Sequence, residues 1–199
     1  MDTGRGRMLV LSGPSGCGKS TLCRELIKDA RVEFSVSATT RPKRAGEVDG
    51  RDYIFLTPEA FKSHVDAGDF IEWAEVFGNL YGTLRAPMEE TLAAGRVYLL
   101  EIDVQGALQL KALNVPGTYV FIAPPDSDEL RRRLVGRGTE SAEAVERRLK
   151  KAEDEYRERV KYDHVVINDE LERALDEVRA IVGLQPGRGS PADQNKEQI

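Results

Sequence analysis

Short apolar runs alternate with segments of helical periodicity along most of the chain. The strand-like segments are residues 8–11, 33–36, 53–56, 70–77, 97–100, 118–122 and 165–167. Helical spacing, or a helix-start signal, marks residues 22–30, 57–59, 87–94 and 171–182. The continuous apolar runs indicate buried strands. Strands that alternate with helices predict an α/β fold with a mainly parallel sheet.

Three segments break this pattern. Residues 38–52 are polar and rich in Arg and Gly, which predicts a loop. Residues 126–161 are dominated by charge, with helical patterns interrupted at residues 136–138. Toward the C-terminus the composition turns to Pro, Gly, Ser, Asp and Gln. We therefore expect a disordered tail at residues 185–199, after one folded unit at residues 1–184.

Composition narrows the class of protein. A chain of 199 residues is of the size of one domain and can bury a core without disulfides. Its net charge of −5 argues against a dedicated nucleic-acid-binding protein. Cys17 and Cys23 lack the spacing of metal ligands and are expected to be free thiols of a reducing compartment. No leader and no membrane-length apolar run is evident, so we expect a cytoplasmic protein without membrane or nucleic-acid partners.

A phosphate-binding motif lies between the first predicted strand and the first predicted helix. Residues 13–20, GPSGCGKS, fit G-x-x-x-x-G-K-[ST] without a gap, in the context that the motif requires. Glycines let backbone N–H groups turn toward phosphate oxygens, and the helix adds its positive end. Lys19 supplies a charge near the β- and γ-phosphates, while the variable position Cys17 is assigned no chemistry. The residues expected to bind the nucleoside triphosphate are Gly13, Pro14, Ser15, Gly16, Cys17, Gly18, Lys19, Ser20 and Thr21.

A nucleoside triphosphate is bound together with Mg²⁺, for which a hydroxyl and a carboxylate near a strand end are suitable ligands. Asp103 follows the apolar strand at residues 97–100 and, with Ser20, is the candidate magnesium site. The same carboxylate can cap the helix expected to begin around Val104. Two alternatives remain at this point: a kinase with a second substrate, or a regulatory nucleotide hydrolase.

A candidate second anion site favours the kinase. Arg41 and Arg44 lie three residues apart on the polar loop, and two guanidinium forks at this spacing can hold one phosphate. A regulatory hydrolase has no need for such a site. A solvated loop with scattered charges is the alternative interpretation.

Several motifs resemble those of the guanylate kinase family. They are TTR (39–41), RAGE (44–47), GRDY (50–53), FIEWA (70–74), GNLYGT (78–83), EIDVQG (101–106), FIAPP (121–125) and RGTE (137–140). They run in order through the chain, and the resemblance extends from about residue 8 to residue 182. It implies phosphorylation of GMP, and of dGMP, to the diphosphate in purine metabolism, with ATP as donor and Mg²⁺ as cofactor.

The resemblance also implies roles for single residues. The positions that match the family's GMP site are Arg41, Arg44, Tyr53 and Tyr81 for the phosphate, Ser37, Glu72 and Thr83 for the base, and Glu101, which is Asp in some relatives. The chemistry of guanine agrees, because its N1–H and exocyclic amine donate to a carboxylate such as Glu72. Adenine carries an acceptor at N1 and would leave that carboxylate unsatisfied.

Arginines crowd the two helices predicted in residues 126–161. In the family this region is a lid that closes over ATP, and Arg137 and Arg148 match the arginines that reach the transferring phosphates. With Lys19 and Arg41 they form the expected catalytic set, which spreads negative charge where water is excluded. The arginines expected to serve only at the surface are Arg131, Arg132, Arg133 and Arg147.

The expected fold is an α/β, P-loop NTPase-type protein: a mainly parallel sheet flanked by helices, with an inserted mixed GMP-binding subdomain and a helical lid. The expected parts are a core at about residues 7–36, 96–125 and 162–184, a GMP-binding part at about 37–90, and a lid at about 126–161. Asn168, after the last strand, matches a residue near the adenine of ATP. No obligate protein partner is implied.

Two rival functions remain. A guanylate-kinase-like scaffold domain would bind partner peptides without catalysis, but the phosphate loop of this chain is intact. A kinase for another phosphorylated acceptor, such as a ribose phosphate, would not need the base contacts that Ser37, Glu72 and Thr83 imply.

Overall fold

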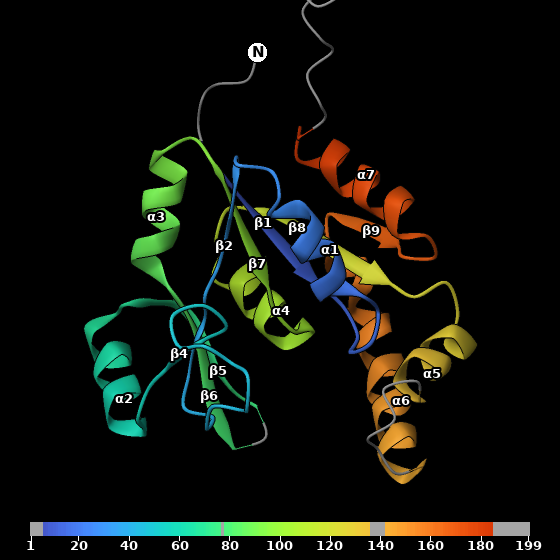
Figure 1. Ribbon diagram of the computed structural model, residues 1–199, viewed down its shortest axis with the longest axis horizontal. Coiled ribbons are helices and arrows are strands. Elements are labelled where there is room, and N and C mark those ends of the chain that lie inside the picture. Colours follow the sequence, from blue (N-terminus) through green and yellow to red (C-terminus); the bar gives the residue numbers. More distant parts are fainter. Residues whose placement is uncertain (1–5, 77, 136–141, 185–199) are drawn as a thin grey trace, which may run out of the picture.

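The computed structural model describes residues 6–76, 78–135 and 142–184. A five-stranded sheet with the order β2-β7-β1-β8-β9 forms the centre of the molecule, and all its strand pairs are parallel (Figure 1). Its strands are β1 (Arg7–Ser12), β2 (Val32–Phe34), β7 (Val97–Glu101), β8 (Thr118–Ala123) and β9 (His164–Ile167). This confirms the predicted parallel α/β sheet.

Helices cover both faces of this sheet. They are α1 (Lys19–Leu26), α3 (Arg85–Ala93), α4 (Val104–Ala112) and α7 (Leu171–Ile181). Along β1, Leu9 and Leu11 pack in one core cluster with residues of α1 and α7, whereas Met8 and Val10 pack in another with residues of α3 and α4. Because successive side chains of a strand point to opposite faces, the apolar run at residues 8–11 of β1 supplies both cores.

A second, mixed sheet lies between β2 and α3 in the chain, with the order β4-β3-β6-β5. Its elements are β3 (Ala38–Thr39), β4 (Ile54–Phe55), α2 (Pro58–Ala67), β5 (Phe70–Val76) and β6 (Asn79–Leu84). Phe61 of α2 stacks on Phe70 with ring centroids 4.6 Å apart. A Cβ at Gly82 would lie 2.9 Å from the Phe70 ring, so glycine allows this close packing. Thr57 caps α2 by accepting from Ala60 N at 3.2 Å, as its sequence predicted.

Two further helices, α5 (Ser127–Val135) and α6 (Ala142–Arg157), pair with each other through Leu130, Leu134 and Leu149. They are followed by a 3₁₀ turn, η1 (Glu158–Lys161). In Figure 1 this pair and the mixed sheet lie on opposite sides of the lower end of the molecule, with the central sheet between and above them. No helix in the described ranges has both the length and the apolar character to cross a membrane.

The structure differs from the sequence prediction in a few element bounds. α1 ends at Leu26, short of the predicted residue 30, because a turn around Asp29 follows, in which Asp29 Oδ1 accepts from Arg31 N at 2.9 Å. The strand predicted at residues 33–36 is β2 and ends at Phe34, and β6 was not predicted as a separate strand. The predicted helix break at 136–138 and the predicted tail at 185–199 lie outside the described residues.

Candidate active site

The phosphate loop joins β1 to α1 in a conformation that depends on glycine. Gly13, Gly16 and Gly18 have φ angles of 141°, 91° and 96°, a region that other residues rarely adopt. At Gly13 a Cβ would also lie 2.2 Å from the Ile122 carbonyl oxygen of β8. The loop is therefore held against the central sheet, and Gly18 begins α1 in the left-handed conformation.

Lys19 lies across this loop. Its Nζ donates to the carbonyl oxygens of Gly13 at 2.7 Å and Pro14 at 2.9 Å, and lies 3.8 Å from Cys17 Sγ. The ammonium group is thus held where the motif predicts the phosphates. Burial raises the pKa of the Cys17 thiol above its ordinary value even though Lys19 lies close, so a neutral thiol is favoured there.

The carbonyl oxygen of Cys17 is the centre of a small network. It accepts from Asn168 Nδ2 at 2.8 Å and from Arg133 Nη1 at 3.4 Å, while Arg133 Nη2 donates to Asn168 O at 2.9 Å. A Cβ at Gly18 would lie 2.2 Å from Asn168 Nδ2, so this contact too requires glycine. The predicted adenine-side residue Asn168 is 6% exposed and supports the loop backbone.

The assignment of Arg133 to surface duty was wrong. This side chain links α5 to the phosphate loop and to the end of β9. The sequence showed three consecutive arginines without distinction. The helix period separates only Arg132 from the other two, because Arg131 and Arg133 lie equally close to the face of the buried Leu130 and Leu134.

Replacing Arg133 by alanine should raise the KM for ATP by roughly tenfold, the loss expected when a guanidinium no longer orients the loop backbone. The KM for the acceptor should hold. Arg132→Ala is the matched control, because Arg132 is 73% exposed and pairs only with Glu129 on the same helix in the described part of the chain. Steady-state kinetics would compare the KM for ATP of the two variants. Equal KM values would show that Arg133 does not support the phosphate loop.

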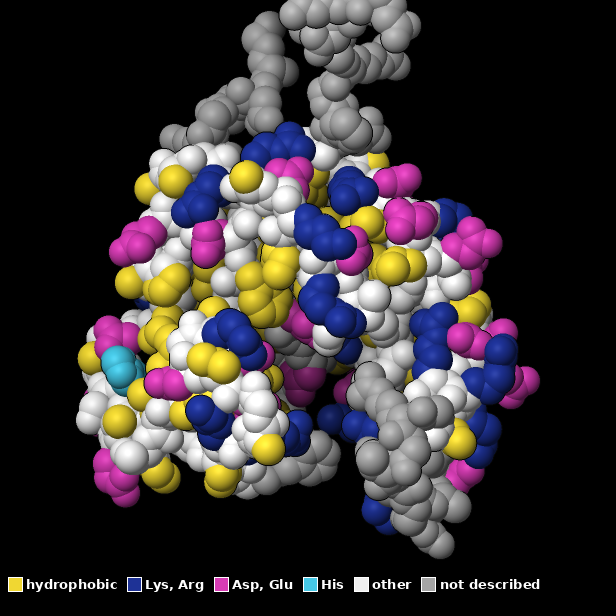
Figure 2. Space-filling view, in the orientation of Figure 1, with side chains coloured by type: hydrophobic (Ala, Val, Ile, Leu, Met, Phe, Trp, Pro, Cys, Tyr) yellow, Lys and Arg dark blue, Asp and Glu magenta, His cyan; other side chains and the backbone are white. Residues whose placement is uncertain are grey.

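A cavity of about 540 Å³ opens between the mixed sheet and the central sheet, and we call it the arginine cavity. Its lining includes Ser37, Arg41, Arg44, Tyr53, Glu72, Tyr81, Glu101, Asp103 and Arg148. Figure 2 shows a hollow in the surface between the mixed sheet, at the lower left, and the pair of helices α5 and α6, at the lower right. Acidic and basic side chains line this hollow. The structure therefore brings most of the predicted acceptor residues to one place.

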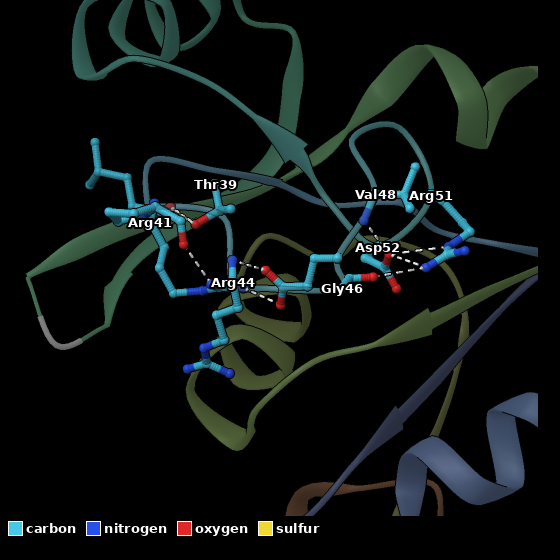
Figure 3. A network of polar contacts seen from close by, with 10 residues as sticks. Thr39, Arg41, Arg44, Gly46, Val48, Arg51 and Asp52 are labelled. Atoms are coloured by element: carbon cyan, nitrogen blue, oxygen red, sulfur yellow. Dashed lines mark hydrogen bonds and ion pairs between the residues drawn. The ribbon is translucent and has the colours of Figure 1, made fainter.

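Arg41 and the two tyrosines form the cationic end of the arginine cavity. The Arg41 guanidinium carbon lies 5.4 Å from the Tyr53 ring centroid, and the Tyr53 and Tyr81 rings meet edge to face at 6.0 Å. A hydrogen bond to Glu47 raises the pKa of Arg41 above its already high ordinary value, so this group stays charged. Arg44 lines the same cavity, and its guanidinium extends away from the loop backbone (Figure 3).

The TTR motif fixes where this loop begins. Thr39 Oγ1 donates to Leu80 O at 2.9 Å and accepts from Arg41 N at 3.1 Å. Thr40 Oγ1 accepts from Leu80 N at 2.9 Å. Both threonines thus tie Arg41 to β6, the strand that carries Tyr81, and this positioning role was not predicted from the sequence.

The arginine cavity is also lined by a buried carboxylate, that of Glu72. Thr83 Oγ1 donates to Glu72 Oε1 at 2.6 Å, and the two residues are cross-strand neighbours of β5 and β6. Burial raises the pKa of Glu72, and the charge of Asp103 adds to this. A Cβ at Gly106 would lie 3.6 Å from Glu72 Oε2, so the absence of a side chain there keeps space beside this oxygen.

A second cavity, of about 350 Å³, lies over the phosphate loop and is called the loop cavity. Ser20 Oγ donates to Glu101 Oε1 at 2.7 Å at its wall. Asp103 Oδ1 accepts from Gly106 N at 2.8 Å, which confirms its predicted role as the cap of α4. Of the two carboxylates, Glu101 is the one that contacts Ser20. Within the described ranges there is no group of three or more His, Cys, Asp or Glu side chains that could hold a metal ion.

Helix α6 contributes a face to both cavities. Arg148 lines the arginine cavity, and Lys151 and Glu155 line the loop cavity. Burial raises the pKa of Glu155, which lies 3.5 Å from Lys151 Nζ. These last two residues were not predicted from the sequence, although their spacing from Arg148 places all three on one face of a helix. The other predicted lid arginine, Arg137, lies outside the described residues.

The two cavities adjoin. Both are lined by Ser15, Ser37, Tyr53, Val76, Glu101, Ile102 and Asp103. A phosphate bound in the loop cavity and a second phosphate bound by the arginines would therefore lie next to each other, because the same residues line both cavities. Such an arrangement can bring a donor and an acceptor phosphate together.

Comparison with known proteins identifies the same chemistry. The chain matches the family model described as guanylate kinase over residues 5–184. It is 54% identical over 176 residues to the guanylate kinase of Nitratidesulfovibrio vulgaris, which covers 88% of this chain and 85% of the relative. It is 47% identical over 185 residues to that of Symbiobacterium thermophilum, covering 92% and 88%. The crystal structure of guanylate kinase from Anaplasma phagocytophilum superposes with a TM-score of 0.74 at 36% identity, covering 92% of this chain and 87% of that one.

Proposed function

The chain belongs to the guanylate kinase family, and from that premise we propose how it phosphorylates GMP to GDP at the expense of ATP: by direct in-line transfer between two bound nucleotides. The observation that supports this most strongly is the junction of the two cavities. The loop cavity holds Lys19 and Ser20, and the arginine cavity holds Arg41, Arg44 and Glu72. A single transfer needs both phosphates in one enclosed space, and the shared walls allow it.

The acceptor phosphate is bound by Arg41 and Arg44, with the hydroxyls of Tyr53 and Tyr81. Arg41 is already ordered against the Tyr53 ring, so little side-chain freedom is lost when the phosphate binds. A phosphate monoester is largely a dianion at neutral pH. Its oxygen can attack without a general base, which agrees with a site built from cations and hydroxyls.

The donor phosphates lie in the phosphate loop. Lys19 exchanges its carbonyl partners for the phosphate oxygens, and Arg148, which lines the arginine cavity, adds a second positive charge near them. The oxygen donors present fit a magnesium ion, because the Ser20 hydroxyl contacts the Glu101 carboxylate and Asp103 lines the same cavity. When bound, Mg²⁺ would neutralise charge on the β- and γ-phosphates.

Guanine is recognised at the Glu72 end of the arginine cavity. One carboxylate oxygen is held by Thr83, and the other faces the space beside Gly106. Guanine N1–H and the exocyclic amine supply the donors that this buried carboxylate needs, whereas adenine would place an acceptor against it. Asp103 lies close enough to raise the pKa of Glu72 and would be a second acceptor for the same base edge.

Replacing Glu72 by glutamine should lower kcat/KM for GMP by roughly a hundredfold, because the amide offers one acceptor where guanine donates twice. The ratio of GMP to AMP turnover should shrink. In the native protein, kcat/KM for GMP should fall on acidification through the raised pKa of Glu72, and this step should be absent from the variant.

Stability gives a second readout for Glu72→Gln. Because the pKa of the carboxyl is raised by folding, its stabilising contribution is lost as pH rises through that pKa. At neutral pH the variant should therefore unfold at an equal or higher Tm. A lower Tm with unchanged nucleotide selectivity would contradict the proposed role.

Three features of the proposal are tested with one protein preparation. In-line transfer inverts the configuration of a chiral γ-phosphorus, whereas a phosphoenzyme intermediate retains it. Turnover should vanish when Mg²⁺ is chelated and return when it is restored. With dGMP it should approach that with GMP, because we assign no described side chain to the ribose 2′-hydroxyl. Retention of configuration would overturn the in-line mechanism.

A further inference from the structure

Glu47 connects the two arginines of the acceptor site. Its Oε1 accepts from Arg41 Nη2 at 2.7 Å, and its Oε2 accepts from the backbone N of Arg44 at 2.8 Å. Its own backbone N donates to Arg44 O at 3.2 Å, which closes a turn over residues 44–47. One carboxylate thus holds the side chain of one phosphate-binding arginine and the main chain of the other.

The Arg41–Glu47 pair is the inner anchor of an otherwise exposed loop. Among residues 41–50, Arg41 and Glu47 are partly buried and all the others are exposed. Their side chains are 11% and 19% exposed. Gly46 has a φ of 86°, and a Cβ added to it would have nothing within 4 Å, so apolar packing does not hold the turn. The shape of the loop therefore depends on its polar contacts.

The remaining contacts of Arg41 show what the pair positions. Arg41 Nη1 donates to Pro42 O at 2.7 Å, and the guanidinium lies 5.4 Å from the Tyr53 ring centroid and 5.8 Å from that of Phe55. A guanidinium has five N–H donors in a planar fork. Pro42 and Glu47 occupy donors on two of its nitrogens, which fixes the plane and leaves other donors for Tyr81 and a phosphate.

We propose that Glu47 is a positioning residue that orders Arg41 and Arg44 for the phosphate of the acceptor nucleotide. This inference rests on the proposed function, because it deepens the assignment of these arginines to GMP. Preorganised donors bind an anion more tightly than donors that must be ordered on binding. The low pKa of Glu47, held down by its hydrogen bonds from Arg41 and Arg44, keeps the carboxylate ionised for this role.

Glu47 could also have the opposite effect on GMP binding, and the two effects predict changes of GMP affinity in opposite directions. A carboxylate beside a phosphate site also repels the ligand and occupies an arginine that the ligand needs. If this competition prevailed, removing Glu47 would tighten GMP binding. If positioning prevails, removing it weakens GMP binding. Glutamine retains one acceptor but cannot accept at both ends, so it should fall between glutamate and alanine.

The experiment measures binding of GMP and of guanosine, and KM for GMP and ATP, in the native protein and in Glu47→Ala and Glu47→Gln. Guanosine lacks the phosphate, so its affinity reports the contacts to the base and the ribose without those to the phosphate. Glu33→Ala is the matched control, because Glu33 forms an exposed ion pair with Arg96 at 2.7 Å in the central sheet.

We expect Glu47→Ala to weaken GMP binding about tenfold to hundredfold, the range for a lost hydrogen bond to a charged group. Guanosine binding and the KM for ATP should stay within about twofold, and Glu33→Ala should match the native protein. Unchanged or tighter GMP binding would overturn the proposal. So would equal losses for GMP and guanosine, which would indicate a collapsed subdomain. A native protein that binds no GMP would overturn the proposed function together with this inference.

Discussion

Replacing Lys19 by alanine is expected to lower kcat roughly a thousandfold or more while the protein stays folded. The ammonium group lies within 2.7 Å of Gly13 O and 2.9 Å of Pro14 O, at the centre of the phosphate loop. A charge at this place stabilises the transferring phosphoryl group, because electrostatic interactions are stronger within a protein site than in bulk water. Initial rates at saturating ATP and GMP measure the loss.

The fold of this variant should survive because the loop is held by other contacts. Gly13 lies against β8, and the Cys17 carbonyl is bonded to Asn168 and Arg133. Lys28→Ala is the matched control, since Lys28 is 68% exposed and pairs with Glu25 just beyond α1. Turnover close to that of the native protein in a folded Lys19→Ala variant would remove Lys19 from the mechanism.

Replacing Arg41 by alanine should lower kcat/KM for GMP by roughly a thousandfold, with a smaller change in the KM for ATP. Two causes add. The acceptor phosphate loses a charged fork, and Glu47 is left beside the site without the cation that it pairs with at 2.7 Å. An uncompensated carboxylate there would repel the phosphate.

These two causes can be separated. The double variant Arg41→Ala with Glu47→Ala should lose less than the two single effects combined, because the repelling carboxylate is gone and Glu47 no longer has Arg41 to order. Arg51→Ala serves as the control, since Arg51 belongs to the same polar segment but is 65% exposed and pairs with Asp52. A single Arg41→Ala variant that binds GMP as tightly as the native protein would refute the assignment of this arginine to the acceptor phosphate.

Local chemistry in the sequence was sufficient for several features. The phosphate loop was predicted from the spacing of its glycines and Lys19, and the structure places it between β1 and α1. The caps of α2 and α4 were predicted from Thr57 and Asp103, because both follow a strand and precede a helix. Each depends on neighbours within a few residues, which the sequence displays directly.

Contacts between segments that are distant in the sequence could not be predicted from local sequence patterns. The pairing of Glu72 with Thr83 depends on the register of β5 and β6, and the contact between Ser20 and Glu101 depends on the order of strands in the central sheet. Family resemblance supplied the first of these sites and assigned Glu101 to the acceptor nucleotide, whereas the position of Asp103 after an apolar strand led to its assignment to the metal. The structure favours Glu101 as the partner of Ser20, and the assignment of both carboxylates stays a prediction.

The central claim of the proposed function is that the two adjoining cavities form a kinase site selective for guanine. Its most direct test is ADP formation from Mg-ATP with GMP, AMP, CMP and UMP offered in parallel. We predict rapid turnover with GMP and at least about a thousandfold less with AMP, as expected of a site whose buried carboxylate must be satisfied by donors. No turnover with GMP in folded protein, or equal turnover with AMP, would contradict this function.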